Sequence, residues 1–424
     1  MRENKNIRRA VASVLAASGL ILPGSVLAQA SKQEDPIPAN PGQDLTAIER
    51  IFLTPSPPPL TAFPELRERW KDTPAFLRDS TFDINVRSYY RDAVANAPAS
   101  VSVKEAWASG GSVSAETGKM FDLVTLGAVL YTSFPLVAPS QYGDTGLLLA
   151  NQQGYAVFGQ LYGQVHLGDA HKVTLGRYLY NTPFLGPHDN RMTPNTFSGY
   201  TVRGTFGAEE GKPAPDGNES GEESSKASGQ GSGLGFRYGG GYIDAIKPRD
   251  AIAFQSMAST AGVPTSDAGV GFAGGVLHWG PARIGAINYY SQDLLNIFYT
   301  EGKYGVDFGS GFNAIAAAQF VAQNSTGQHL MNGGTPFATN QFGTKIDFGY
   351  ETAILTLGYS VVNTGFAIQT PWSANPFYTD ALIQDFQRAG EQAVMVGLSH
   401  RLTHFGLPGV AIAAHFFNGA TSAP

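Results

Sequence analysis

Apolar and polar side chains alternate with a period of two through most of the chain after residue 80. The segment 81–90 places Phe82, Ile84, Val86 and Tyr90 on one face and Asp83, Asn85, Arg87 and Tyr89 on the other. The segment 155–167 places Tyr155, Val157, Leu161, Val165 and Leu167 opposite Phe158, Gln160, Tyr162, Gln164 and His166. This period is typical of β-strands, whose successive side chains point to opposite faces of a sheet. The pattern therefore predicts strands, and it puts Arg87 on the polar face of the first one.

Fifteen such segments are predicted. They lie near residues 81–91, 102–117, 119–133, 153–168, 170–180, 196–207, 233–247, 268–278, 282–291, 293–306, 311–323, 339–351, 352–363, 391–402 and 409–419. Most have about ten residues or slightly more, and a tilted strand needs about 9–11 residues to cross a bilayer, whereas soluble strands peak near five or six. The segment lengths therefore favour strands that span a membrane.

The connections between the segments support a membrane barrel. Very short turns, as at Gly118, Gly168 and Glu351, mostly interleave with long loops at 134–152, 181–195, 248–267, 324–338 and 364–390. Short turns on one side and long loops on the other are typical of outer-membrane barrels. Two connections depart from this order, the long link 207–232 and the tight link at 291–292. We expect an all-β protein with a transmembrane antiparallel β-barrel over residues 79–424; a soluble β-sandwich or β-solenoid is the alternative that composition allows.

The N-terminus predicts export. Four basic side chains within the first nine residues precede an apolar run from Ala10 to Ala28, which Pro23 and Gly24 interrupt. This arrangement indicates a cleaved signal peptide over residues 1–28, with a buried helix or membrane anchor as the alternative. Residues 29–78 are expected to form a periplasmic N-terminal segment, because seven prolines between 36 and 59 favour extended backbone. Residues 63–70 could form one short helix or continue this linker.

Composition narrows the possible functions. Charged residues make up 15% of the chain, glycine accounts for 51 of 424 residues, and there is no cysteine. A disulfide framework and thiolate metal sites are therefore excluded. The net charge of −6 becomes about −9 once residues 1–28 are removed, since they carry four basic groups and one acidic group. A negative chain argues against nucleic acid as a partner.

Several ordered motifs resemble one family. The run STFDINVRSYYR at residues 80–91 resembles the first strand of the OprD-type outer-membrane porins of Gram-negative bacteria. Further stretches agree in the same order: DNRMTPNTFSG at 189–199, GGYI at 240–243, IKPR at 246–249, INYY at 287–290, NIFY at 296–299, DF at 385–386 and GLPG at 406–409. The resemblance covers roughly residues 75–420. It implies an 18-stranded barrel with both termini in the periplasm, in which outer-membrane lipid and small water-soluble solutes are the partners.

The resemblance also implies where solutes pass. In this family the third and seventh long loops fold inward to form a narrow eyelet, and arginines line one wall opposite acidic groups. The third loop here is Asn181–Asn195 and the seventh is Thr364–Gly390. The residues expected at the eyelet or along the lumen are Arg191, Asp189, His188, Arg87, Arg91, Asp380, Asp385 and Arg388. Arginine suits carboxylate solutes because its planar fork can bond both oxygens, although Arg191 read without the motif is an ordinary surface arginine.

The chain departs from the family pattern in three respects. Fifteen strands would leave the C-terminus outside, so we expect a chain that lacks three closing strands. His400 and His415 stand where relatives are more regularly basic, which leaves the choice between anions and cations open. The link 207–233 is an acidic insertion rich in glycine and serine, for which the composition predicts a disordered turn.

Enzyme chemistry finds no support in the motifs. A barrel hydrolase needs a nucleophile, a base and an orienting group, and no such set can be nominated. The glycine-rich stretches at 207–212 and 231–235 lack the spacing of phosphate-binding or dinucleotide-binding loops. We expect neither a cofactor nor a metal. The sequence favours a passive porin for carboxylates, amino acids or peptides, as a monomer or weak trimer; a structural or adhesive barrel without channel activity is the alternative.

Overall fold

The computed structural model describes residues 70, 72–97, 100–207, 234–374, 376–381, 384–405, 407 and 410–421. The predicted signal peptide, the proline-rich segment up to residue 62 and the acidic insertion at 208–233 lie outside the described residues. Of the short helix expected at 63–70, only Trp70 is described. A four-residue helix, α2 (Ala75–Arg78), precedes the first strand.

All fifteen predicted strands are present. They are β1 (Thr81–Ala97), β2 (Ser100–Glu116), β3 (Val124–Val137), β4 (Tyr155–Leu167), β5 (His171–Tyr178), β6 (Thr196–Gly207), β7 (Leu234–Lys247), β9 (Val270–Trp279), β10 (Ala282–Ser291), β11 (Leu295–Gly309), β12 (Phe312–Ser325), β13 (Ala338–Tyr350), β14 (Ala353–Val362), β15 (Glu391–Arg401) and β16 (Ala411–Thr421). A two-residue strand, β8 (Gln255–Ser256), was not predicted. It precedes the short helix α3 (Met257–Thr260). The 3-10 helices within the described residues are η3 (Ser140–Tyr142), η5 (Leu330–Asn332) and η6 (Leu402–Phe405).

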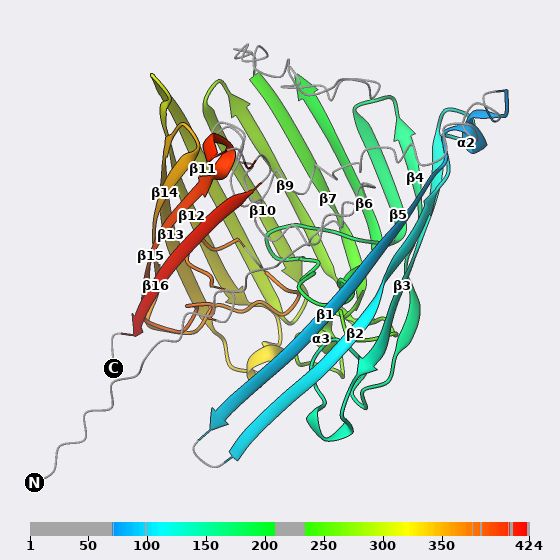
Figure 1. The fold of residues 1–424 in the computed structure, drawn as a ribbon, viewed down its shortest axis with the longest axis horizontal. Coiled ribbons are helices and arrows are strands. Elements are labelled where there is room, and N and C mark those ends of the chain that lie inside the picture. Colours follow the sequence, from blue (N-terminus) through cyan, green and yellow to red (C-terminus); the bar gives the residue numbers. More distant parts are fainter. Residues whose placement is uncertain are drawn as a thin grey trace, which may run out of the picture.

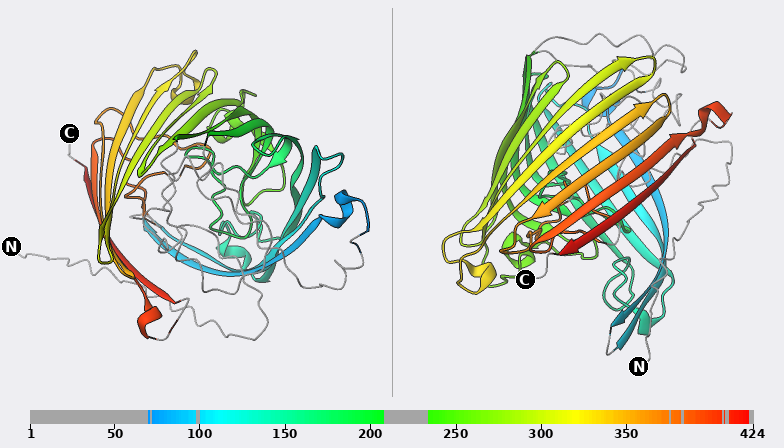
Figure 2. Two further views of the ribbon diagram at one scale, coloured as in Figure 1. Left: turned by 90° about the horizontal axis from the view of Figure 1, so that it is seen from above. Right: turned by 90° about the vertical axis from the view of Figure 1, so that its left-hand side faces the viewer.

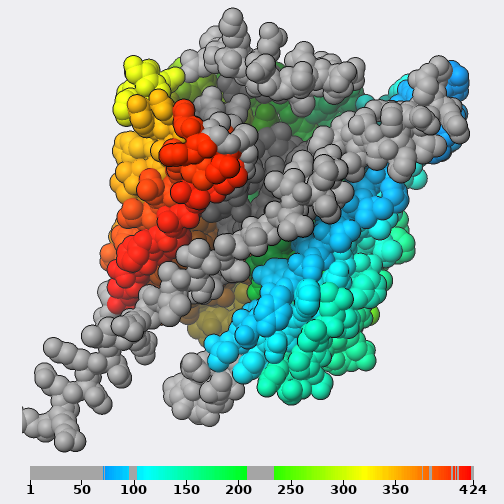
Figure 3. Space-filling model, in the orientation of Figure 1, coloured from blue at the N-terminus to red at the C-terminus, as the bar shows by residue number. Residues whose placement is uncertain are grey.

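The strands form one antiparallel sheet in which sequence neighbours pair. Its order is β1 through β7, then β9 through β16, while β8 pairs only with β7. The sheet curls into a barrel whose interior is crossed by loops (Figures 1 and 2). Figure 3 shows β1 in blue and β16 in red on the same side of the molecule, and within the described residues these edge strands do not pair with each other. No described helix is long and apolar enough to cross a membrane.

The two faces of the sheet differ in chemistry. On β13, Phe342, Ile346 and Phe348 are 44%, 39% and 46% exposed, whereas Gln341 and Asp347 are 1% and 9% exposed. Apolar side chains thus point out and polar ones point in, which is the reverse of a soluble barrel and fits a lipid-facing surface. The alternation predicted for this strand and for β1 is confirmed.

The faces predicted for β4 are wrong in its first half. A β-bulge shifts the register, so that Phe158 pairs with Leu130 and Gln160 pairs with Val129 while Gly159 is the extra residue. One extra residue reverses the alternation. Tyr155 and Val157 therefore face the lumen, on the same side as Gln160, and Phe158 is 54% exposed on the outer face. A glycine is required there because a Cβ at residue 159 would lie 2.6 Å from the ring of Tyr131.

Long loops fold into the barrel, as the resemblance implied. The third loop (residues 179–195) and the seventh loop (residues 363–390) both contribute to a buried apolar cluster with the wall strands β9–β12. Phe184 and Trp372 are 1% and 0% exposed. The Trp372 indole Nε1 donates to the Met257 carbonyl at 2.9 Å, which joins the seventh loop to α3. One side of the interior is thereby filled with protein.

Candidate functional site

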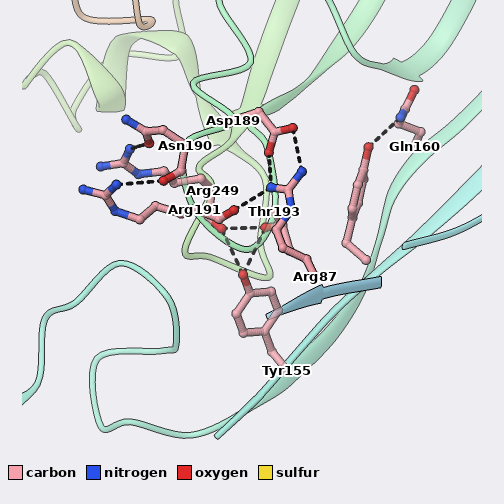
Figure 4. Close-up of polar contacts among 9 residues, drawn as sticks. Arg87, Tyr155, Gln160, Asp189, Asn190, Arg191, Thr193 and Arg249 are labelled. Atoms are coloured by element: carbon pink, nitrogen blue, oxygen red, sulfur yellow. Dashed lines mark hydrogen bonds and ion pairs between the residues drawn. The ribbon is translucent and has the colours of Figure 1, made fainter. Parts of the chain in front are cut away.

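Arg87 on β1 holds the tip of the third loop. Its guanidinium donates to both carboxylate oxygens of Asp189, at 2.6 and 3.1 Å, and to the carbonyl of Arg191 (Figure 4). The Arg87 side chain is 19% exposed and that of Asp189 is 28% exposed. Arg87 faces inward, as strand alternation predicted, but its charge is balanced by Asp189. We call this arrangement the Arg87 clamp.

A tyrosine fixes the other half of the loop. The Tyr155 hydroxyl lies 3.0 Å from Thr193 Oγ1 and 3.0 Å from the Arg249 carbonyl, to which Thr193 also donates at 2.6 Å (Figure 4). The Arg249 backbone N–H donates to Asn195 Oδ1 at 2.8 Å. These bonds join the third loop to the segment that follows β7. Tyr155 can make them only because the bulge in β4 turns it inward.

Three further arginines gather beside the clamp. Arg191 Nη1 donates to the Asn190 carbonyl at 2.7 Å, and Arg249 donates to the Asn190 side-chain oxygen. Arg91 on β1 donates to the carbonyl of Thr145 in the loop after β3. We call Arg91, Arg191 and Arg249 the arginine cluster. Arg191 and Arg91 were predicted at this site; Arg249 was not, although the motif that contains it was noted.

The arginine cluster carries unbalanced positive charge. Burial and then repulsion from Arg91 lower the pKa of Arg191, and burial and then repulsion from Arg191 lower the pKa of Arg249. Asp250 is the nearby carboxylate that opposes both effects. Arg191 Nε is buried and has no hydrogen-bond partner among the described residues. A bound anion would relieve the repulsion and could accept from such a donor.

His188 lies in the same loop with a left-handed backbone, φ 45°. Its Nδ1 is 3.4 Å from the Ser373 hydroxyl of the seventh loop, which also accepts from Asn195 Nδ2 at 2.9 Å. Burial, followed by the charges of Arg249 and Arg191, lowers the pKa of His188 to about 4. The imidazole is therefore neutral near pH 7. The third and seventh loops meet at this point, as expected.

The charged residues nominated on the seventh loop make local contacts. Asp380 accepts from Gln387 Nε2 at 3.1 Å, and Arg388 Nε donates to Glu391 Oε1 at 3.1 Å. Asp385 is exposed. The described bonds do not connect these three side chains to the arginine cluster, and their role along a solute path stays a prediction.

An acidic wall that sequence reasoning did not nominate lies on β11 and β13. Glu301 is 2% exposed and accepts from the Tyr378 hydroxyl at 2.7 Å. Lys345 Nζ lies 3.1 Å from Asp347 Oδ2. Strand alternation could have predicted both carboxylates in the barrel interior, because each lies on the inward-facing side of its strand. We call Glu301 and Asp347 the acidic wall.

The comparisons with known proteins give one family model that matches part of the chain and several solved structures with a similar fold. The model of the OprD family of outer membrane porins matches residues 74–205. Among solved structures, Pseudomonas aeruginosa OccK9 (OpdG) is similar at 17% identity and TM-score 0.66, covering 82% of this chain and 84% of that one. P. aeruginosa OpdK, solved with vanillate, is similar at 18% identity and TM-score 0.64, covering 81% and 83%. Acinetobacter baumannii OccAB3 is similar at 15% identity and TM-score 0.66, also covering 81% and 83%.

No curated protein sequence matches the chain. The low identities to the solved structures make their likeness a statement about fold, while the family match rests on sequence. That match spans β1 to β6, and with them the third loop that carries Asp189 and Arg191. The chain is therefore similar in sequence to the OprD family of outer membrane porins over residues 74–205, and it shares the barrel fold of the solved structures.

Proposed function

We propose that this porin is a passive channel that prefers small water-soluble anions, with carboxylates as the favoured class. The observation that carries the proposal is the arginine cluster, in which Arg91, Arg191 and Arg249 repel one another and one buried donor of Arg191 lacks a partner. Fixed cations in a water-filled constriction concentrate anions, and a charged ring or wall selects solutes by sign. The planar guanidinium fork can bond both oxygens of a carboxylate.

The clamp and the cluster have different roles in this proposal. Arg87 is paired to Asp189 and bonded to a backbone carbonyl, so it orients the third loop instead of binding solute. His188 is neutral, and in this proposal its imidazole offers a hydrogen-bonding group to the solute beside the arginine cluster. Vanillate, with which the similar porin OpdK was solved, is itself a carboxylate. Amino acids and peptides are the second solute class, which an acidic group opposite the arginines would favour.

The test is a planar-bilayer recording of the full chain under a salt gradient, which gives conductance and reversal potential. We expect discrete steps with anion preference, and block of the chloride current by benzoate but not by benzyl alcohol. Arg191→Gln and Arg249→Gln should each reduce the anion preference. The matched control is Arg177→Gln, since Arg177 lies opposite the outward-facing Leu161 and stacks on Phe254 at 4.5 Å.

Each outcome bears on a different part of the proposal. Cation preference in the unmodified protein would refute anion selection while leaving a channel. Folded protein without steps would favour the structural or adhesive barrel. Equal effects of the Arg177 and Arg191 substitutions would show that surface charge, and not the cluster, sets the selectivity.

A further inference from the structure

The seventh loop covers the acidic wall. Glu301 has a side chain that is 1% exposed although it points into the barrel interior from β11. The Tyr378 hydroxyl of the seventh loop donates to Glu301 Oε1 at 2.7 Å, and Lys303 Nζ lies 3.8 Å from the same oxygen. A carboxylate on the lumen face of a porin would ordinarily meet water and ions. Here the loop separates it from them.

Tyr378 contacts both ion pairs of this wall. Its hydroxyl bonds Glu301, and its ring lies 5.6 Å from the Lys345 ammonium, which pairs with Asp347 at 3.1 Å. An ammonium over a tyrosine ring is attracted by the negative face of the ring. Asp347 also accepts from Thr356 Oγ1 at 2.6 Å. One side chain of the loop is therefore attached to two charged groups on two strands.

The residues on either side of Tyr378 hold the same stretch of loop. The Thr379 hydroxyl lies 2.6 Å from the hydroxyl of Ser360 on β14, and both residues are buried. Phe377 is 6% exposed and packs on Phe184 of the third loop, with ring centroids 5.9 Å apart. The stretch 376–380 is thus fixed to the wall by polar bonds on one side and joined to the third loop by apolar contact on the other.

The covering has an electrostatic consequence. The field of an exposed carboxylate would oppose that of the arginine cluster across the passage, since opposite charges lining one constriction cancel in part. A carboxylate that is bonded, paired with lysine and kept from direct approach acts on a passing ion more weakly. The positive side of the interior is therefore left dominant.

We propose that Tyr378 is a positioning residue of the channel, which holds residues 376–380 over Glu301 and the Lys345–Asp347 pair and so withholds the acidic wall from the solute. This inference rests on the proposed anion preference and names the residue that maintains it. Tyr378 acts through the loop and the carboxylates, not by touching the solute. It was not among the residues that the sequence nominated.

The test compares the reversal potentials of four variants with that of the unmodified protein. Tyr378→Ala should shift the reversal potential toward cations, and adding Glu301→Gln should remove most of that shift. Glu301→Gln alone should change it little, because the carboxylate is already covered. Tyr290→Ala is the matched control and should have no effect, because Tyr290 lies on the outer face of β10, where it is 50% exposed. A shift that persists in the double variant, or no shift in Tyr378→Ala, would overturn the proposal.

A second measurement does not depend on ion preference. The chain has no cysteine, so Asp347→Cys introduces a single thiol in the acidic wall and leaves the bond from Tyr378 to Glu301 in place. Its reaction with a charged methanethiosulfonate should be at least about tenfold faster when Tyr378→Ala is added, since local opening controls access. Equal rates would show that Tyr378 does not hold the cover. An unmodified protein without current would defeat the proposed function, whereas an anion-preferring channel with unchanged Tyr378 variants would defeat this inference alone.

Discussion

The Arg87 clamp should control local opening of the third loop. Arg87→Met keeps an unbranched side chain but removes the two bonds to Asp189 and the one to the Arg191 carbonyl. Hydrogen bonds to charged groups contribute about 1.5–3 kcal/mol each to stability. Because both partners are 19–28% exposed, water replaces much of the loss, and we take about 2 kcal/mol for the whole clamp. Since 1.4 kcal/mol is a factor of about ten, the opening equilibrium should rise about 30-fold.

The assay uses a cysteine beside the clamp. Met192 is 1% exposed in a small apolar cluster with Ala108 of β2, so a thiol at residue 192 is shielded while the loop is closed. The rate of thiol modification in Met192→Cys should rise about 30-fold when Arg87→Met is added, because reaction through a brief opening follows the open population. Ala393→Cys, on β15, outside this cluster and also 1% exposed, is the control and should react at an unchanged slow rate.

Two results would refute this reasoning. Equal acceleration at both cysteines would mean that the barrel itself had loosened. Unchanged rates at both would mean that the bonds from Tyr155 and the apolar cluster hold the loop without the clamp. A further check is Asp189→Leu in the Arg87→Met background, which removes the uncompensated carboxylate and should recover part of the protection.

Three other perturbations have defined outcomes. The pKa of His188 is lowered to about 4 from an ordinary 6.5, so its protonation adds positive charge only as the pH falls through about 4. The reversal potentials of the unmodified protein and of His188→Gln should therefore agree above about pH 5 and separate below it. A difference at pH 7 would contradict the assignment. Tyr289→Phe removes the hydrogen bond to the Thr182 hydroxyl at 2.8 Å and the one from the Phe184 N–H at 3.3 Å. It should lower the free energy of unfolding in lipid vesicles by about 1–3 kcal/mol, whereas Tyr290→Phe, on the outer face, should not. Gly159→Ala should lower the free energy of unfolding, measured by urea titration in lipid vesicles, by about 1–3 kcal/mol because its Cβ would lie 2.6 Å from a tyrosine ring. Gly163→Ala, whose nearest contact is 3.5 Å, should be tolerated, and equal unfolding midpoints would contradict the role of the bulge.

Alternation along the strands was sufficient to predict most of the fold. All fifteen long strands lie where the period of two placed them, because an outer face in lipid and an inner face in water impose strict alternation. The inward position of Arg87 followed from the same rule. The bulge in β4 could not be predicted, because it depends on the packing of Gly159 against Tyr131 on the neighbouring strand.

The site was predicted only in part, for a related reason. The motif in the third loop predicted Asp189 and Arg191 at the eyelet, and in the structure both residues bond to Arg87, but motif and alternation do not say which charges pair. Arg87 was expected to face the solute, and in the structure its charge is balanced by Asp189. Arg249 and Tyr378 come from irregular loops, where the direction of a side chain is set by long-range contacts and not by local periodicity. Such residues are found only once the loops are seen folded against the wall.

The bulge at Gly159 divides β4 into two halves with independent rules for substitution. After Gly159 in the chain, odd-numbered residues such as Leu161 face lipid. Before it, odd-numbered residues such as Tyr155 face the lumen. Deleting Gly159 would turn Tyr155 toward the bilayer and Phe158 toward the lumen, although every other residue of the strand is unchanged. If related porins are aligned across β4 with a one-residue gap at this point, the residues that precede the gap are assigned to the wrong face of the sheet. Substitutions in this wall must therefore be designed from the local register.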